Sequence, residues 1–258
     1  MKKKFDILIQ ARLTSRRLPN KVIKKIGNRT ALKMLLDRLK KIKFINNTVI
    51  ILPNNKKNNF LNNYVKKLGY KTFRGSENNV LDRYYKASKK FKSTNIIRVT
   101  SDCPFLDFEI LNKMIKIFTT LDFDYMSNIN PRTFPKGLDI EIFTFKTLKK
   151  TWLLAKTKYD KEHVTPHMVR NKNILHYNFK NNVNYSNLRI TLDTAKDLKI
   201  LNNIYRKLTK IRNFVLKDII KLYKKSPKIF RWIKLKKKIL IGGNDNPNKI
   251  GQCGKPSC

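Results

Sequence analysis

A cluster of basic side chains follows a short apolar run near the amino terminus of this 258-residue chain. The segment ILIQARLTSRRLPNKVI (7–23) carries four of them: Arg12, Arg16, Arg17 and Lys21. The segment lacks the G-x-x-x-x-G-K-[ST] pattern, in which backbone amides cradle phosphates. Side-chain cations would have to neutralise a polyphosphate here instead. The loop therefore indicates a triphosphate site, and a solvated basic loop is the alternative that these residues leave open.

Two aspartates occupy comparable places far apart in the sequence. Asp102 ends the β-rich run NIIRVTSD (95–102), and Asp193 ends the run NLRITLD (187–193). Mg²⁺ is usually held by one or two carboxylates together with phosphate oxygens and water. The two aspartates and the basic loop therefore predict a metal–triphosphate site. The alternative for either aspartate is a helix cap, because DTAKDL would place Asp193 or Thr194 at a helix amino terminus.

The elements that would position these residues alternate between strands and helices. Apolar, β-rich runs occupy 5–10, 48–52, 71–75 and 95–102. Helical patterns follow them at 31–42, 58–69, 79–91 and 108–121, with Thr30 and Asp107 as caps. Strands joined by helical crossovers form a mainly parallel sheet covered on both faces. Because ligands bind outside the carboxyl ends of such strands, the loops after Gln10, Gly75 and Ser101 would share one rim.

The second half of the chain is less regular, and we expect it to complete the same domain. Short strands are predicted at 124–129 and 138–143, followed by a helix at 146–156 and a capped segment from Asp160. Two more strands are predicted at 174–179 and 187–193, and two helices at 195–208 and 215–225. We therefore predict one domain over residues 1–226. Residues 227–258 are basic and read as a poorly ordered tail.

The net charge suggests an alternative class of function. A formal charge of +42 would suit a protein that binds nucleic acid or another polyanion, because cations release counterions from phosphate backbones. Lysine is, however, spread over nearly every segment beside Asn and Ile, residues with A/T-rich codons. Genome composition could produce that pattern without selection for polyanion binding, so we do not expect nucleic acid as a partner. A non-catalytic polyanion-binding protein on this fold stays the alternative.

Other features of the composition argue against a membrane or disulfide-rich protein. No apolar run approaches the roughly 18 residues that a membrane span requires. The start MKKKFDILIQ lacks the apolar core and cleavage site of a signal peptide, so we expect a cytoplasmic protein. Three cysteines do not make a disulfide framework.

Several blocks of the sequence, taken in order, resemble the sugar-acid cytidylyltransferases, and most closely the spore-coat-polysaccharide type of that family. The blocks are IQARLTSRRLPNKVI (9–23), RGSENNVLDRYYKA (74–87), IIRVTSDCPFLD (96–107), FPKGLDIEIF (134–143), EHVTP (162–166) and LRITLDTAKDL (188–198). The resemblance covers about residues 5–225. It implies a Rossmann-like, three-layer α/β/α nucleotidyltransferase sandwich with a mainly parallel sheet.

The resemblance also implies a reaction and roles for residues. It implies transfer of CMP from CTP to a sugar or ulosonic acid, with Mg²⁺ as cofactor and release of pyrophosphate, for surface-polysaccharide biosynthesis. The residues that it assigns to the nucleotide are Ala11, Arg12, Ser15, Arg17, Lys21, Ser76 and Glu77. Asp102 and Asp193 would bind the metal and, with Arg12 and Lys21, form the catalytic group. Asp139, Glu141 and His163 would face the sugar. The oligomeric state is open, with a homodimer as one option.

The chain departs from the family pattern at three places. The family usually carries glycine where Thr14, Asn20 and Ser101 stand. Side chains at these positions could crowd a close approach of the backbone to phosphate.

Two further groups of residues have to be weighed, as a zinc site and as a glycosyltransferase motif. His163 and His167 are four residues apart, but Pro166 interrupts the helix and the H-E-x-x-H zinc pattern is absent. DFD (122–124) matches the D-x-D spelling of glycosyltransferases that use sugar nucleotides, although no phosphate loop accompanies it. A glycosyltransferase is therefore a second alternative function.

Overall fold

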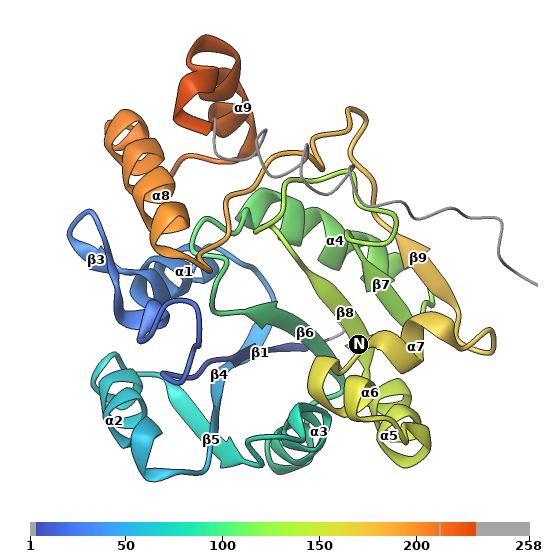
Figure 1. Cartoon of the computed structure of the whole chain (residues 1–258). Helices are drawn as coiled ribbons and strands as arrows, with labels where there is room; N and C mark the ends of the chain where they lie inside the picture. The colour runs from blue at the N-terminus through green and yellow to red at the C-terminus, as the bar shows by residue number, and fades with distance from the viewer. Residues whose placement is uncertain (1–3, 212, 231–258) are drawn as a thin grey trace, which may run out of the picture.

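The computed structural model describes residues 4–211 and 213–230, which fold around one seven-stranded sheet (Figure 1). The strand order is β5-β4-β1-β6-β8-β7-β9. The strands are β1 (Phe5–Gln10), β4 (Ile45–Pro53), β5 (Lys71–Gly75), β6 (Asn95–Thr100), β7 (Tyr125–Ser127), β8 (Glu141–Thr144) and β9 (His176–Asn178). All neighbouring strands pair in parallel except β8, which runs antiparallel to β6 and to β7. The predicted mainly parallel sheet is therefore confirmed. A separate hairpin joins β2 (Lys25–Ile26) to β3 (Arg29–Thr30).

Helices cover both faces of the sheet, as expected for three layers. They are α1 (Ala31–Leu39), α2 (Asn59–Lys67), α3 (Val80–Lys90), α4 (Phe108–Thr120), α5 (Phe145–Leu154), α6 (Lys158–His163), α7 (Pro166–Arg170), α8 (Ala195–Leu208) and α9 (Leu216–Lys225). Short 3₁₀ turns are η1 (Lys21–Ile23), η2 (Lys56–Asn58) and η3 (Pro227–Phe230). In Figure 1, α3 and α5 lie on one side of the sheet, and α1, α4 and α8 lie on the other.

The buried side chains form one core on each face. Ile7 and Ile9 of β1 pack into the larger core, whereas Leu8 packs into the smaller one, because successive side chains of a strand point to opposite faces. All three are fully buried. At about 25 cal/mol per Å² of apolar surface, each contributes roughly 1.5–3 kcal/mol, which anchors the strand whose carboxyl end carries the basic loop.

Local hydrogen bonds start the helices where the sequence predicts. Thr30 accepts from the backbone N–H of Lys33 at 3.1 Å, and Asp107 accepts from Glu109 and Ile110 at 2.8 and 3.1 Å. Such caps contribute about 1 kcal/mol each. The predicted cap at Asp160 is wrong, because the cap is Thr157, three residues earlier, whose hydroxyl accepts from the Asp160 N–H at 3.0 Å.

The predicted strand at 187–193 is absent from the sheet, so Asp193 does not end a strand as expected. The segment is extended but pairs with the loop before β8, where Lys136 exchanges backbone hydrogen bonds with Leu188 and Ile190 at 2.9 and 2.7 Å. Gly137 permits this approach, since a Cβ there would lie 2.6 Å from the backbone of Ile190. Likewise β6 ends at Thr100, two residues before Asp102. Both carboxylates therefore belong to loops.

The described chain continues past the domain boundary expected at residue 226. Pro227–Phe230 form the turn η3, and the buried ring of Phe230 packs edge-on against Tyr223 at 5.3 Å. The rest of the expected tail, 231–258, lies outside the described residues. Within the part of the chain that the structure describes, no helix is long and apolar enough to cross a membrane.

Candidate functional site

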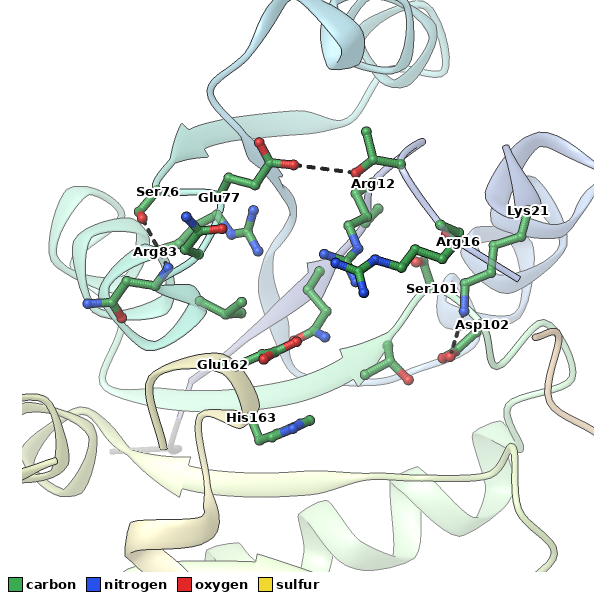
Figure 2. A pocket seen from close by; sticks show the side chains of 18 of the residues that line it. Arg12, Arg16, Lys21, Ser76, Glu77, Arg83, Ser101, Asp102, Glu162 and His163 are labelled. Atoms are coloured by element: carbon green, nitrogen blue, oxygen red, sulfur yellow. Dashed lines mark hydrogen bonds and ion pairs between the residues drawn. The ribbon is translucent and has the colours of Figure 1, made fainter. Parts of the chain in front are cut away.

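A pocket of about 1200 Å³ opens at the carboxyl ends of β1, β5 and β6 (Figure 2). It is lined by the basic loop after β1, by the loop between β5 and α3, by residues 100–102, and by α6. The three loops that the sequence predicted to share one rim are therefore side by side. The predicted site residues that line this pocket are Ala11, Arg12, Ser15, Arg17, Lys21, Ser76, Glu77, Asp102, Asp193 and His163.

The basic loop is fixed by hydrogen bonds that leave its cations facing the pocket. Asn58 accepts from the backbone N–H of Leu13 at 2.9 Å, and Asn20 donates its own N–H to the Leu13 carbonyl at 3.1 Å. Arg12 and Arg16 are exposed along the pocket wall. Three exposed guanidinium groups and an ammonium on one wall create a local field that attracts a polyphosphate.

The departures from the family pattern are accommodated without a clash of backbone conformation. Asn20 adopts φ +58°, and asparagine is among the few residues besides glycine that tolerate this left-handed conformation. Thr14 and Ser101 have no such backbone angle. The Thr14 hydroxyl points across the pocket to Glu77 at 3.5 Å.

Lys21 lies between the two aspartates that the sequence paired. Its ammonium nitrogen is 3.0 Å from Oδ2 of Asp102 and 2.9 Å from Oδ1 of Asp193. The other carboxylate oxygen of Asp193, Oδ2, accepts from Nη2 of Arg189 at 2.6 Å, and Arg17 lies 3.4 Å from Oδ1, the oxygen that Lys21 contacts. The two carboxylates thus converge on a single cation.

Backbone contacts hold the two aspartates together. The carbonyl of Asp102 accepts from the N–H of Leu192 at 2.8 Å and from the hydroxyl of Thr191 at 3.0 Å. The α8 helix begins at a capping box of Thr194 and Asp197, and the Asp197 carboxylate also accepts from the N–H of Asp193 at 3.0 Å. Thr194 is therefore the cap, and the side chain of Asp193 is left to face the pocket.

These contacts shift the pKa values of Asp193 and Lys21. Burial alone would raise the pKa of the Asp193 carboxyl, but Lys21 and Arg189 outweigh it and hold that pKa well below its usual range. Burial alone would lower the pKa of Lys21, but Asp102 and Asp193 outweigh it and raise that pKa. Asp193 and Lys21 therefore stay oppositely charged at neutral pH.

The carboxylates of Asp102 and Asp193 are chemically suited to bind a divalent cation. Two hard oxygen donors already converge on one positive charge, which is the protein contribution that Mg²⁺ commonly needs. Within residues 4–211 and 213–230, no group of three or more acidic, histidine or cysteine side chains gathers around such a point. The remaining ligands would have to be water and phosphate oxygens.

Glu77, in the loop between β5 and α3, is linked to the basic loop by a hydrogen bond. Its carboxylate accepts from the side-chain amide of Asn55 at 2.7 Å and from the Thr14 hydroxyl at 3.5 Å. Ser76 accepts from the N–H of Asn79 at 3.0 Å, just before α3 begins. Both residues are exposed to the pocket, in the place expected from the sequence.

Of the three residues expected on the sugar side, only His163 lines the pocket. It ends α6 beside Glu162, and its ring lies 4.5 Å from that of Tyr159. Asp139 lies outside the pocket lining and is held by Arg132 through two hydrogen bonds of 2.6 and 2.9 Å.

Glu141 is in the core and does not face the pocket. It is 1% exposed, lies opposite Arg98 in the pairing of β6 with β8, and forms an ion pair with that residue. The hydroxyl of Tyr125 also donates to it, at 2.6 Å. Arg98 donates in turn to the side-chain oxygen of Gln10 at 3.3 Å, and Gln10 does line the pocket. Any effect of Glu141 on a ligand must therefore pass through Arg98 and Gln10.

Sequence reasoning missed Gln10, Glu162 and Arg83, which also line the pocket. Arg83 stands three residues after Val80 in the first turn of α3, and both line the pocket because residues i and i+3 share a helix face. That spacing, in a helix expected to begin at the rim, is a signal that could have found it.

Comparisons with known proteins agree with this geometry. Residues 7–237 match the model of a family described as cytidylyltransferase. The chain is 38% identical over 225 residues to the uncharacterised protein MJ1063 of Methanocaldococcus jannaschii, covering 86% of this chain and 91% of that one. It is 30% identical over 232 residues to the spore coat polysaccharide biosynthesis protein SpsF of Bacillus subtilis, covering 86% and 95%.

A solved structure supports the fold directly. A cytidylyltransferase from Leptospira borgpetersenii superposes with a TM-score of 0.85 at 34% identity, covering 88% of this chain and 97% of that one. The resemblance stated from the sequence motifs, and the α/β nucleotidyltransferase fold that it implied, are confirmed.

Proposed function

The chain belongs to the cytidylyltransferase family, and from that premise we propose that it transfers CMP from CTP to a sugar or ulosonic acid, releasing pyrophosphate. One observation carries the proposal. The basic loop and the two converging carboxylates, Asp102 and Asp193, meet in one pocket at the carboxyl rim of the sheet. A triphosphate needs cations along its length and a divalent ion at its oxygens, and this pocket offers both kinds of partner.

The chemistry is an in-line displacement at the α-phosphorus of CTP. A hydroxyl oxygen of the sugar forms the new bond to phosphorus and gives up its proton to the surrounding water, the bond from phosphorus to the bridging oxygen breaks, and pyrophosphate leaves. Arg12, Arg17 and Lys21 would bind the triphosphate and stabilise charge on the leaving oxygens. Asp102 and Asp193 would hold Mg²⁺, which supplies charge neutralisation at phosphate oxygens worth several kcal/mol. Positioning and electrostatics therefore account for most of the expected acceleration.

The acceptor sugar would enter from the side of α6. His163 and Glu162 line that side of the pocket, opposite the basic loop, as Figure 2 shows. Both side chains are exposed and can hydrogen-bond to hydroxyl groups. The similarity to SpsF, named for spore coat polysaccharide biosynthesis, supports a product destined for a surface polysaccharide. Because CTP is a cytoplasmic metabolite, we propose that the protein acts there.

The test is a matrix of nucleotides and acceptors. Purified protein with Mg²⁺ is incubated with each of the four NTPs and a panel of ulosonic acids and simple sugars, and pyrophosphate release is measured. We expect release with CTP that depends on one class of acceptor. Release that is independent of any acceptor, or that is greatest with another nucleotide, would contradict the proposal. Lys24→Met serves as a control for the loss of one exposed cation beside the loop, outside the residues that line the pocket.

A further inference from the structure

Val164, directly after the pocket residue His163, has a backbone conformation that its own side chain disfavours. Its φ and ψ are +74° and −55°, and among the residues that the structure describes it is the one β-branched residue at positive φ. The N–H of Thr165 donates to the carbonyl of His163 at 2.9 Å, so the three residues form a γ-turn of the rare, strained kind. Such strain persists only where the surroundings enforce it, and it gathers at functional sites.

The protein core enforces this turn. Val164 is fully buried in the smaller core, as is Met168 of α7. The N–H of Val164 donates to the carbonyl of Asp160 at 2.9 Å and so completes the hydrogen bonding of α6. Burial of the isopropyl group therefore offsets the cost of the unfavourable backbone angles.

The turn fixes α6 and α7 to each other. Two residues, Val164 and Thr165, join the end of α6 to the start of α7. At the far ends, the Asp160 carboxylate of α6 accepts from Nη2 of Arg170, the last residue of α7, at 2.6 Å. The pair of helices is thus held by the γ-turn on one side and by an ion pair on the other.

The residues that this arrangement presents to the pocket are Glu162 and His163. Both line the pocket at the end of α6, as Figure 2 shows. The ring of His163 also lies against that of Tyr159, with centroids 4.5 Å apart. Tyr159 is itself exposed, so it is not a rigid support. The buried anchor next to His163 is the turn at Val164.

We propose that Val164 is a positioning residue, whose buried side chain holds the strained turn that aims His163 at the acceptor. The inference rests on the proposed function, because it takes the α6 side of the pocket as the acceptor side. Val164 does not line the pocket, so it acts only through His163. A relaxed linker would let the end of α6 move, and acceptor binding would then have to restore its order at a cost in affinity.

The first test uses the free protein, so that turnover does not enter. The chain holds three histidines, and His163→Gln identifies the ring signals of His163 in proton NMR spectra. In the parent, the nearby Tyr159 ring displaces these signals from those of a free imidazole. Val164→Gly should move them toward the free values, and the N–H of Thr165 should exchange with solvent at least about tenfold faster. Signals and exchange rates equal to those of the parent would overturn the inference.

Two further variants guard against a general loss of folding. Val164→Ala keeps the Cβ but drops two methyl groups, and Val49→Ala makes the same change at a fully buried site of the same core, in β4. Because glycine adopts positive φ readily, Val164→Gly should melt no lower than Val164→Ala, the reverse of the usual order. Val49→Ala should lower the melting temperature but leave the His163 signals unchanged. A clearly higher melt for Val164→Ala than for Val164→Gly, or displaced His163 signals in Val49→Ala, would overturn the inference.

The second test measures KM with an acceptor that supports pyrophosphate release. Val164→Gly should raise the KM for this acceptor about two- to tenfold, the value of one neutral hydrogen bond, and leave the KM for CTP unchanged. In a His163→Ala background the same substitution should add nothing, because the two residues act as a unit. An unchanged acceptor KM, additive effects of the two substitutions, or an equal rise in the KM for CTP would overturn the inference.

Failure of the inference is distinguishable from failure of the proposed function. If Val164→Gly displaces the His163 signals but no acceptor supports pyrophosphate release, transfer is refuted and the positioning of His163 in the pocket stands. If pyrophosphate is released and Val164→Gly leaves both the His163 signals and the acceptor KM unchanged, transfer stands and positioning by Val164 is refuted.

Discussion

Lys21 and Asp193 form an ion pair at 2.9 Å although 172 positions separate them in the sequence. The same ammonium group lies 3.0 Å from Asp102, so one lysine pairs with two carboxylates that arrive from different loops. A divalent cation held by those carboxylates would share their charge with Lys21. The lysine would then be free to turn toward a triphosphate, which links the proposed metal site to the proposed phosphate site.

Replacing Lys21 tests this link. Lys21→Met keeps the length of the side chain but leaves Asp102 and Asp193 facing each other without their shared cation. We expect CTP affinity to fall about ten- to a hundredfold, because a charge-assisted contact is worth about 1.5–3 kcal/mol. The melting temperature of the variant should also rise more on addition of Mg²⁺ than that of the parent. Unchanged CTP affinity, with Lys24→Met as the matched control, would reject the phosphate role.

The two aspartates are tested separately from the lysine. Asp102→Asn and Asp193→Asn preserve shape but remove charge from the proposed metal site, and each should lower the rate by about two decades or more. Higher Mg²⁺, or Mn²⁺ in its place, should restore part of the loss. Asp37→Asn, which removes a carboxylate from a surface ion pair, should change neither the rate nor its metal dependence. If both site variants titrate with Mg²⁺ like the parent, the metal assignment is wrong.

Glu141 gives a prediction of the opposite kind, because it is a core residue. Glu141→Gln leaves the buried charge of Arg98 without its partner, and breaking such a pair costs about 3–5 kcal/mol of unfolding free energy. Urea unfolding of this variant and of Asp139→Asn should show the larger loss at residue 141. A variant of normal stability with an altered acceptor KM would instead mean that Glu141 contacts the sugar.

Asp160 makes the anchoring of α6 dependent on pH. Burial alone would raise the pKa of its carboxyl, but hydrogen bonds from Thr157 and Arg170, at 2.7 and 2.6 Å, outweigh it and lower that pKa. The ordinary value of about 3.9 applies to the unfolded chain. The folded-state pKa is lower, so this contribution to stability is complete above about pH 4 and is lost as pH falls through the folded-state value.

The measurement is urea unfolding of the parent and of Asp160→Asn across that range. The variant should be about 1–2 kcal/mol less stable at pH 6, and the difference should shrink steadily toward pH 2. A difference that stays constant with pH would show that the carboxylate charge contributes nothing to the anchoring of the helix that carries His163.

Much of the fold could be predicted because local patterns decide it. The apolar run of β1 and the capping residues Thr30 and Asp107 act through near neighbours in the sequence, and the structure places them as expected. The rim of the site follows from topology, since parallel strands end on the same edge. This general rule is enough to predict that Lys21 and Asp102 lie at the same rim.

The errors lie where distant contacts decide. The segment 187–193 has the composition of a strand, but it pairs with the loop at Lys136 instead of with the sheet. The family resemblance places Glu141 beside the sugar, whereas in the structure it is buried opposite Arg98 in the strand pair. Phe230 extends the folded chain past residue 226 because it packs on Tyr223, a contact that the basic composition of the segment conceals.

Transfer of a nucleotidyl group within this pocket can be followed through the α-phosphate of CTP. The protein is incubated with Mg²⁺, an acceptor that supports pyrophosphate release, and CTP labelled in either its α- or its γ-phosphate. We expect the α label to appear in a CMP–sugar conjugate and the γ label to appear only in pyrophosphate. Label from the γ-phosphate on the sugar, or α label recovered only as free CMP or CDP, would contradict it.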